Sequence, residues 1–212
     1  MASESRLLVP GHDPAVFASF PASPTASSAL SSVRPIIESM QALAFWKAVA
    51  VDRSNLLEQF LALLETHRVP FCLIGGQAVN AYVDPLVSLD LDVVIAFDRL
   101  GEVEALLTSP YRVERFTHSV NVSARGSDLR VQIQLDPRYR SFIERATPRD
   151  VLGVQMPVAA VEDVLQGKIW AAQDSTRRGS KRQKDLADIA RLLEAYPHLR
   201  RSVPSDVLDR LL

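Results

Sequence analysis

Residues 71–95 read FCLIGGQAVNAYVDPLVSLDLDVVI, and this stretch decides the fold that the sequence predicts. Phe71–Ile74 is a short apolar run typical of a buried strand, Gly75–Gly76 is typical of a tight turn, and a helix is expected to follow. The next apolar segment is typical of a second strand and carries Asp90 and Asp92. Because side chains alternate along a strand, both carboxylates are expected on one face of the sheet.

Two carboxylates on one sheet face repel each other unless a cation lies between them. A hard divalent ion such as Mg²⁺, or Mn²⁺ in its place, relieves the repulsion and binds carboxylates together with substrate phosphates. Gly75 and Gly76 would let a ligand approach the backbone closely, and N–H groups at a helix start suit a triphosphate. The pattern therefore predicts phosphoryl or nucleotidyl transfer with Asp90 and Asp92 as metal ligands, against the alternative of an ordinary solvated strand.

Other nucleotide-binding motifs are missing, because the sequence has neither a GxxxxGK[S/T] run nor a GxGxxG run. The 212-residue chain is 47% hydrophobic, enough for one ordinary core, and its net charge of −1 gives no overall attraction to nucleic acid. Its one cysteine, Cys72, lies in the apolar strand segment and is interpreted as a buried hydrophobe. No apolar run approaches membrane-spanning length, so we expect a soluble, cytoplasmic protein without a membrane partner.

Three regions differ in composition. Residues 1–39 are rich in Ala, Ser and Pro and are expected to form a flexible low-complexity extension. Residues 40–150 hold the Gly-Gly and Asp-x-Asp segments and are expected to form the core, and residues 151–212 a C-terminal helical part of the same domain. Within the core we expect a helix over 54–67, a helix capped by Asp98, and strands over about 111–123 and 129–135. The predicted fold class is α+β, a mixed sheet with flanking helices.

The order of strand, Gly-Gly turn, helix and Asp-x-Asp strand resembles the nucleotidyltransferase fold of the polymerase-β type. Such enzymes commonly carry a third metal-binding carboxylate on the strand that corresponds to residues 129–135. Here Gln132 and Gln134 hold amides at the expected positions. Asp136 lies on the correct face at the strand end and is a weaker candidate ligand, with turn initiation before Pro137 as its alternative role.

The C-terminal part contains two expected helices. Residues 161–172 carry Lys168 beside an apolar stripe, and residues 184–195 carry Asp185 and Asp188 on one helical face. Each residue also has a simpler interpretation. Lys168 would extend along the stripe with its charge in solvent, Asp185 would favour a helix N-terminus, and Asp188 would pair with a nearby cation.

Between these helices lies the one concentrated basic segment. Its cations include Arg177, Arg178, Lys181 and Arg182. One interpretation is a docking site for an RNA acceptor, because phosphate contacts give sequence-independent affinity. The alternative is a solvated charge run between two helices.

Three blocks together resemble the AbiEii-like nucleotidyltransferases of abortive-infection and type IV toxin–antitoxin systems, over about residues 53–195. The blocks are Gly75-Gly76 with Ser88-x-Asp90-x-Asp92, then Lys168-Ile169-Trp170-Ala171, then Lys184-Asp185-Leu186-Ala187-Asp188-Ile189. The resemblance implies metal binding at the first block and a lysine, Lys168, that meets the nucleotide phosphates. It also implies a catalytic aspartate at Asp185, with Asp188 the competing choice. Nucleotide contacts are expected from Gly75, Gly76, Gln77 and Ser88.

The sequence therefore predicts a Mg²⁺-dependent nucleotidyltransferase that moves a nucleoside monophosphate from a nucleoside triphosphate to a hydroxyl of RNA or protein. The resemblance implies a toxin–antitoxin component with a cognate partner protein. The alternative is a catalytically weak nucleotide-binding or antitoxin-like module of the same fold. Gln132, Gln134 and Leu86 favour that alternative, because family members often carry arginine at the position of Leu86.

Overall fold

The computed structural model describes residues 54–211, so the expected extension over residues 1–39 lies outside the described part. The helices and strands there are α2 (Leu56–Thr66), β1 (Phe71–Ile74), α3 (Gly75–Asn80), β2 (Asp90–Ile95), η2 (Phe97–Arg99), α4 (Leu100–Thr108), β3 (Arg112–Arg115), β4 (Ser119–Ser123), β5 (Arg130–Gln134), η3 (Pro137–Arg145), β6 (Thr147–Val151), β7 (Val154–Val158), α5 (Val161–Gln173), α6 (Gly179–Ala195), η4 (Pro197–Ser202) and α7 (Ser205–Leu208).

A seven-stranded mixed sheet, in the order β3-β4-β5-β2-β1-β7-β6, forms the centre of the described part. Strand β2 pairs antiparallel with β1 and parallel with β5, and β1 pairs parallel with β7. Because β1 and β2 are central, their apolar residues are covered on both faces, and Leu73, Leu91 and Val93 are fully buried. The predicted α+β class with a mixed sheet is confirmed.

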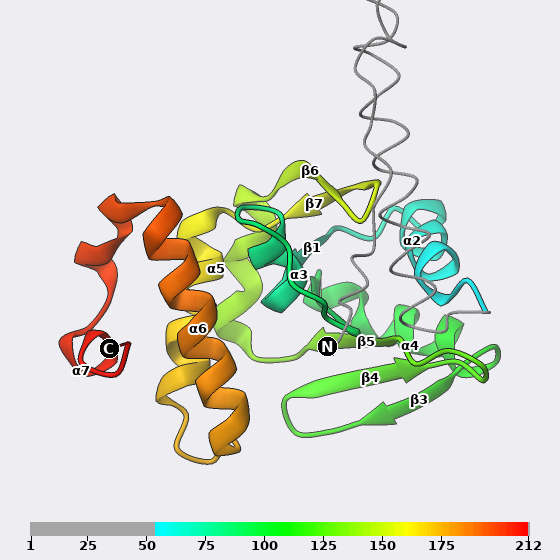
Figure 1. Ribbon diagram of the computed structural model, residues 1–212. Coiled ribbons are helices and arrows are strands. Elements are labelled where there is room, and N and C mark those ends of the chain that lie inside the picture. Colours follow the sequence, from blue (N-terminus) through cyan, green and yellow to red (C-terminus); the bar gives the residue numbers. More distant parts are fainter. Residues whose placement is uncertain (1–53, 212) are drawn as a thin grey trace, which may run out of the picture. The chain divides into compact units, whose positions relative to one another are not determined.

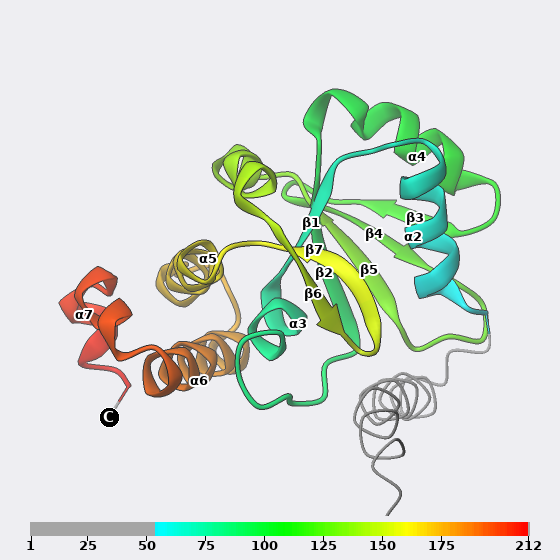
Figure 2. The same cartoon turned by 90° about the horizontal axis from the view of Figure 1, so that it is seen from above.

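Helices cover the strands from two sides. Figures 1 and 2 show α5 and α6 side by side at one end, α2 and α4 at the other end, and the strands between them. The amphipathic pattern of α2 buries Leu56, Phe60 and Leu64, as the helical spacing predicts. In the same way α6 buries Ile189 and Leu192. Helix α3 lies near α6 and joins the end of β1 to the loop that leads into β2.

The β6–β7 hairpin is the main element that the sequence analysis does not predict. Strand β7 lies beside β1 in the sheet, although residues 151–212 were expected to be helical. Pro148 and Pro157 argue against strands in the sequence, but both are tolerated here, and Pro148 sits on the edge strand β6. Leu152 and Gly153 make the turn with φ of 58° and 81°.

Three smaller expectations were wrong. The single strand expected over 111–123 is the hairpin β3–β4, in which the N–H of Phe116 bonds to the carbonyl of Ser119. Helix α6 begins at Gly179, so most of the expected basic loop is its first two turns. Asp98 does not cap α4, because it lies in the preceding 3₁₀ turn η2.

Candidate active site

The two aspartates of β2 lie on one face of the central sheet. Asp90 and Asp92 are partly exposed and alternate with the fully buried Leu91 and Val93. Asp92 lies opposite Ile74 on one neighbouring strand and Gln132 on the other. The polar face expected from the period of two is therefore present, and Asp92 stands where β1 passes into α3.

The backbone of Gly75 packs tightly against the side chain of Asp92. Its φ is +68°, and a Cβ at this position would lie 2.0 Å from Oδ2 of Asp92. Only glycine allows both this backbone conformation and this approach. At Gly76 a Cβ would lie 3.2 Å from Oγ of Ser88 and 3.8 Å from Nζ of Lys184. The Gly-Gly pair therefore brings the α3 backbone against a carboxylate on one side and a hydroxyl and an ammonium on the other.

A cavity of about 80 Å³ lies over Asp92. Gly75, Lys168 and Asp185 line it with Asp92, so all three sequence blocks meet there, and Gln132 of β5 completes this part of the wall. Burial raises the pKa of the Asp92 carboxyl, and Asp90 adds to this rise, while the cations Lys168, Arg177 and Lys184 oppose it. Because burial outweighs these cations, they compensate the ionised form of Asp92 only in part, and a bound cation would add to the compensation.

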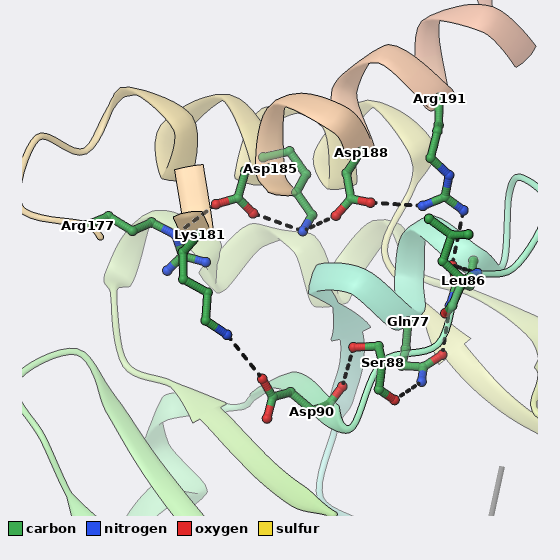
Figure 3. A network of polar contacts seen from close by, with 11 residues as sticks. Gln77, Leu86, Ser88, Asp90, Arg177, Lys181, Asp185, Asp188 and Arg191 are labelled. Atoms are coloured by element: carbon green, nitrogen blue, oxygen red, sulfur yellow. Dashed lines mark hydrogen bonds and ion pairs between the residues drawn. The ribbon is translucent and has the colours of Figure 1, made fainter. Parts of the chain in front are cut away.

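Asp90 differs from Asp92 because cations already contact it. Arg130 lies 2.7 Å from one carboxylate oxygen. Nζ of Lys181 lies 3.8 Å from the other oxygen (Figure 3). The side chain of Asp90 remains 27% exposed. Sequence reasoning missed Arg130 as a neighbour of Asp90, because it comes from β5, forty residues further along the chain.

These residues fit a divalent ion that is shared with a substrate. Within residues 54–211, no group of three or more His, Cys, Asp or Glu side chains is close enough to hold a metal alone. Two carboxylates remain, Asp90 and Asp92, with the amide of Gln132 beside Asp92. Mg²⁺ commonly binds through one or two carboxylates and completes its shell with water and substrate phosphates. The donor set suits such an ion rather than a cage made only of protein groups.

Lys168 lies at the centre of a chain of buried ion pairs. Its Nζ is 2.7 Å from Oδ2 of Asp188 and 3.1 Å from Oδ1 of Asp185, and the residue is only 7% exposed. Arg177 bonds the other oxygen of Asp185 at 2.8 Å, and Arg191 bonds Asp188 at 2.9 Å (Figure 3). Positive and negative groups thus alternate in the order Arg177, Asp185, Lys168, Asp188 and Arg191.

This chain fixes the charge of Lys168. Burial alone would lower the pKa of its ammonium, but Asp188 and Asp185 outweigh burial and raise the pKa above its usual value. Lys168 therefore remains protonated and stays beside Asp92 without extending into solvent. The simpler interpretation, in which the charge of Lys168 lies in solvent beside an apolar stripe, does not hold, because α6 packs its two aspartates against this point of α5.

The two candidate catalytic aspartates occupy different places. Asp185 lines the cavity over Asp92, whereas Asp188 is not among the residues that line it. Arg191 links Asp188 to the loop before β2, because its guanidinium also bonds the side chain of Asn80 and the carbonyl of Asp84. Asp188 thus binds Lys168 directly and, through Arg191, connects it to the loop before β2, without lining the cavity.

A second hollow, of about 610 Å³, lies beside Asp90. Ser88 lines it together with the cations Arg130, Lys181 and Lys184. The basic segment is therefore divided, since Arg177 faces Asp185 and Lys181 faces Asp90.

Two predicted site residues have other roles in the structure. Gln77 is 1% exposed, and its amide donates to the carbonyl of Ser88 at 2.8 Å, so it holds the loop in place (Figure 3). Asp136 accepts a bond from the N–H of Arg138 at the start of η3 and pairs with that guanidinium. It lies outside the cavity over Asp92 and matches the alternative role of turn initiation.

Comparison with known proteins assigns this chain to a family. The family model "Nucleotidyl transferase AbiEii toxin, Type IV TA system" matches residues 56–211. The chain belongs to the AbiEii family. It is therefore a nucleotidyltransferase, as the three sequence blocks predict. A comparison with curated proteins found no match.

Solved nucleotidyltransferases share the fold. ANT(2'')-Ia in complex with adenylyl-2''-tobramycin is 16% identical with a TM-score of 0.52, and the match covers 74% of this chain and 97% of that one. The solution structure of the antibiotic-resistance factor ANT(2'')-Ia gives 15% identity and a TM-score of 0.50, with coverage of 74% and 86%. At such identities the likeness shows the fold alone. No described helix of the AbiEii chain is both long and apolar enough to span a membrane.

Proposed function

We propose that this AbiEii protein moves a nucleoside monophosphate from a nucleoside triphosphate to an acceptor hydroxyl of RNA or protein, with Mg²⁺ or Mn²⁺. The observation that carries the proposal is the cavity in which Asp92, Lys168 and Asp185 meet against the backbone of Gly75. A largely buried carboxylate whose charge is only partly compensated, beside a protonated lysine, suits a substrate that arrives with both metal and phosphates.

The triphosphate is proposed to bind on the side of Ser88. The hollow beside Asp90 has Lys181, Lys184 and Arg130 along its wall, and these cations suit the charge of the β- and γ-phosphates. Lys184 also lies close to Gly76, so the backbone of the Gly-Gly pair and an ammonium would face the same phosphate. The α-phosphate would then lie over Asp92.

In the proposed reaction the acceptor oxygen forms a bond to the α-phosphorus while the bond from that phosphorus to the bridging oxygen of pyrophosphate breaks. A divalent ion held by Asp90 and Asp92 would supply positive charge to the phosphate oxygens as pyrophosphate leaves. Lys168 would stabilise the transferred group as a fixed point charge, since both of its aspartates hold it in position.

Asp185 is the better candidate to orient the acceptor hydroxyl and take its proton. It lines the cavity, whereas Asp188 does not. Its bonds to Lys168 and Arg177 also fix the direction of its carboxylate. Asp188 is proposed to act on the reaction through Lys168.

One observation favours the second candidate, a nucleotide-binding or antitoxin-like module with little catalysis. The residue opposite Asp92 on β5 is the amide Gln132, where a carboxylate would bind a metal more tightly. Such a module would bind nucleotide without transferring it. The role in a toxin–antitoxin pair and the cognate partner protein belong equally to both candidates.

A label-transfer assay tests the proposal. The purified protein is incubated with each α-labelled nucleoside triphosphate, Mg²⁺, and either total RNA or cell extract. We expect label in RNA or in a protein band, and its loss on chelation of the metal. Nucleotide binding without any transferred label would instead support the second candidate.

A further inference from the structure

A wider basin opens from the cavity over Asp92. Its volume is about 490 Å³, and it shares Gln132, Gln134, Tyr139 and Arg177 with the cavity as lining residues. The end of β5, the start of η3 and the end of α5 supply most of its wall. This volume is large enough for a nucleoside.

The basin and the hollow beside Asp90 lie toward opposite ends of strand β5. Along β5, Arg130 lines the hollow, Gln132 lines the cavity and basin, and Gln134 follows on the basin side. Strand β2 runs parallel beside it, with Asp90 opposite Arg130 at the hollow and Asp92 opposite Gln132 at the cavity. At about 3.3 Å per residue, Arg130 and Gln134 are roughly 13 Å apart.

The order of hollow, cavity and basin along β5 places the basin on the side from which an acceptor would approach. The attacking and leaving oxygens of a phosphoryl transfer lie roughly in line on opposite sides of phosphorus. If pyrophosphate leaves toward the cations of the hollow, the acceptor must approach from the Gln134 end of β5. The basin lies at that end of the strand.

Arg138 presents a flat surface in the basin. Its guanidinium lies 4.7 Å from the ring centroid of Trp170, and two of its N–H groups bond Oδ2 of Asp136 at 2.8 and 2.6 Å. Trp170 is held in turn by Phe142, which stacks at 5.9 Å with an angle of 14°, and by the edge contact of Tyr139 at 5.3 Å. The Arg138 side chain remains 56% exposed. A guanidinium fixed in this way is a platform on which a planar ring can stack.

The charges around the basin are largely balanced. Arg138 is paired with Asp136, and Arg177 is paired with Asp185. Asp174, the other aspartate in the wall, bonds the N–H and hydroxyl of Thr176. A wall of paired charges and amides suits an uncharged ring with a sugar better than a polyphosphate.

We propose that the basin binds the terminal nucleoside of the acceptor, with its base stacked on Arg138 and its ribose hydroxyl directed to the cavity over Asp92. The inference rests on the proposed transfer reaction and adds the chemical class of the acceptor. The nucleoside either ends an RNA chain or is free in solution, and both sources present the same ring and sugar.

A binding experiment separates these sources without requiring transfer. Fluorescent single-stranded RNA octamers ending in each of the four nucleosides are titrated into the full chain by anisotropy. Mg²⁺ and a triphosphate with a methylene group between its α- and β-phosphates are present to fill the proposed triphosphate site. Matched octamers have an abasic residue at the 3′ end, and free nucleosides are added as competitors.

Base-dependent binding of the octamers identifies an RNA end. Binding of a fluorescently labelled free nucleoside, in a parallel titration in which the octamers do not bind, identifies a free nucleoside. Arg138→Ala should weaken the base-dependent part about tenfold to a hundredfold, which is the usual range for loss of one stacking contact. Arg138→Lys should weaken it similarly, because lysine keeps the charge beside Asp136 but has no plane.

Arg140→Ala is the matched control. Arg140 lies on the same η3 segment and sits 4.7 Å over the ring of Phe97, but it lines a different hollow. It should leave binding unchanged, and thermal melting of all variants checks the fold. Equal binding of abasic and intact RNA with no nucleoside competition would overturn the inference, as would full affinity in Arg138→Lys. Absence of label transfer alone would overturn the proposed reaction and leave the binding result standing.

Discussion

Gly75→Ala tests whether the close approach of α3 to Asp92 is required for activity. The new Cβ would lie 2.0 Å from Oδ2 and 2.7 Å from Cβ and Cγ of Asp92, whereas an ordinary contact begins at 3.4 Å. The carboxylate must therefore move by roughly 1.4 Å, since strong repulsion acts at shorter separations. A misplacement of about 1 Å in a reacting group can cost about a hundredfold in rate.

The backbone adds a separate cost in stability. Gly75 has a φ of +68°, a conformation that costs an L-residue about 1–2 kcal/mol. For a domain of this size the melting temperature should fall by about 2–8 °C. Label transfer should fall about a hundredfold at a temperature where the variant remains folded.

Gly126→Ala separates the two effects. Gly126 has a φ of +82°, but no heavy atom lies within 4 Å of the position of its Cβ. This control should lose similar stability and keep its transfer rate. Normal transfer by Gly75→Ala, with melting lowered as in Gly126→Ala, would refute the reasoning, because Asp92 would then tolerate displacement.

Three further predictions follow from the same contacts and from the sequence. Lys168→Met should abolish transfer and also reduce the unfolding free energy by about 3–5 kcal/mol, measured in urea, because it leaves Asp185 and Asp188 buried with less compensation; an unchanged midpoint would contradict the ion-pair assignment. Burial raises the pKa of Asp92, so the folded state binds more protons than the unfolded state between the ordinary value of 3.8 and the raised value. The unfolding free energy should therefore fall as pH rises through that window, and Asp92→Asn should remove that part of the fall. A chain that begins at Met40 should melt within a few degrees of the full chain, because the Ala/Ser/Pro-rich extension offers too little apolar area to offset its ordering; a large loss of stability would show that the extension packs on the domain.

Patterns with a fixed period were enough to predict the central elements. Strand β1 and helix α2 follow from continuous and 3.6-period apolar residues. The period of two places Asp90 and Asp92 together, and the family resemblance identified the same blocks. These features depend on local chain geometry, which a sequence states directly.

Contacts between distant segments could not be predicted in this way. Local spacing describes pairs on one helix, such as Asp188 with Arg191, but not the approach of α5 to α6 that brings Lys168 between Asp185 and Asp188. The ion pair of Arg130 with Asp90 depends in the same way on the register of β5 against β2.

Composition was misleading where local signals conflict with tertiary pairing. Two prolines hid the β6–β7 hairpin, and the β3–β4 turn has no glycine or proline to mark it. The run of cations before α6 suggested one patch, yet Arg177 and Lys181 turn toward carboxylates of the site. A run of charged residues in a sequence does not show which of its side chains face the protein and which face solvent.

Calorimetry of nucleotide binding tests most directly the claim that Asp90 and Asp92 hold a divalent ion for a triphosphate. A triphosphate with a methylene group between its α- and β-phosphates is titrated into the wild type, Asp90→Asn and Asp92→Asn, each with Mg²⁺ and with chelator. Asp98→Asn, an exposed aspartate away from the cavity over Asp92, is the control. We predict metal-dependent binding in the wild type and the control, and its loss in both site variants with the fold intact. Unchanged metal-dependent binding in both site variants would contradict the assignment.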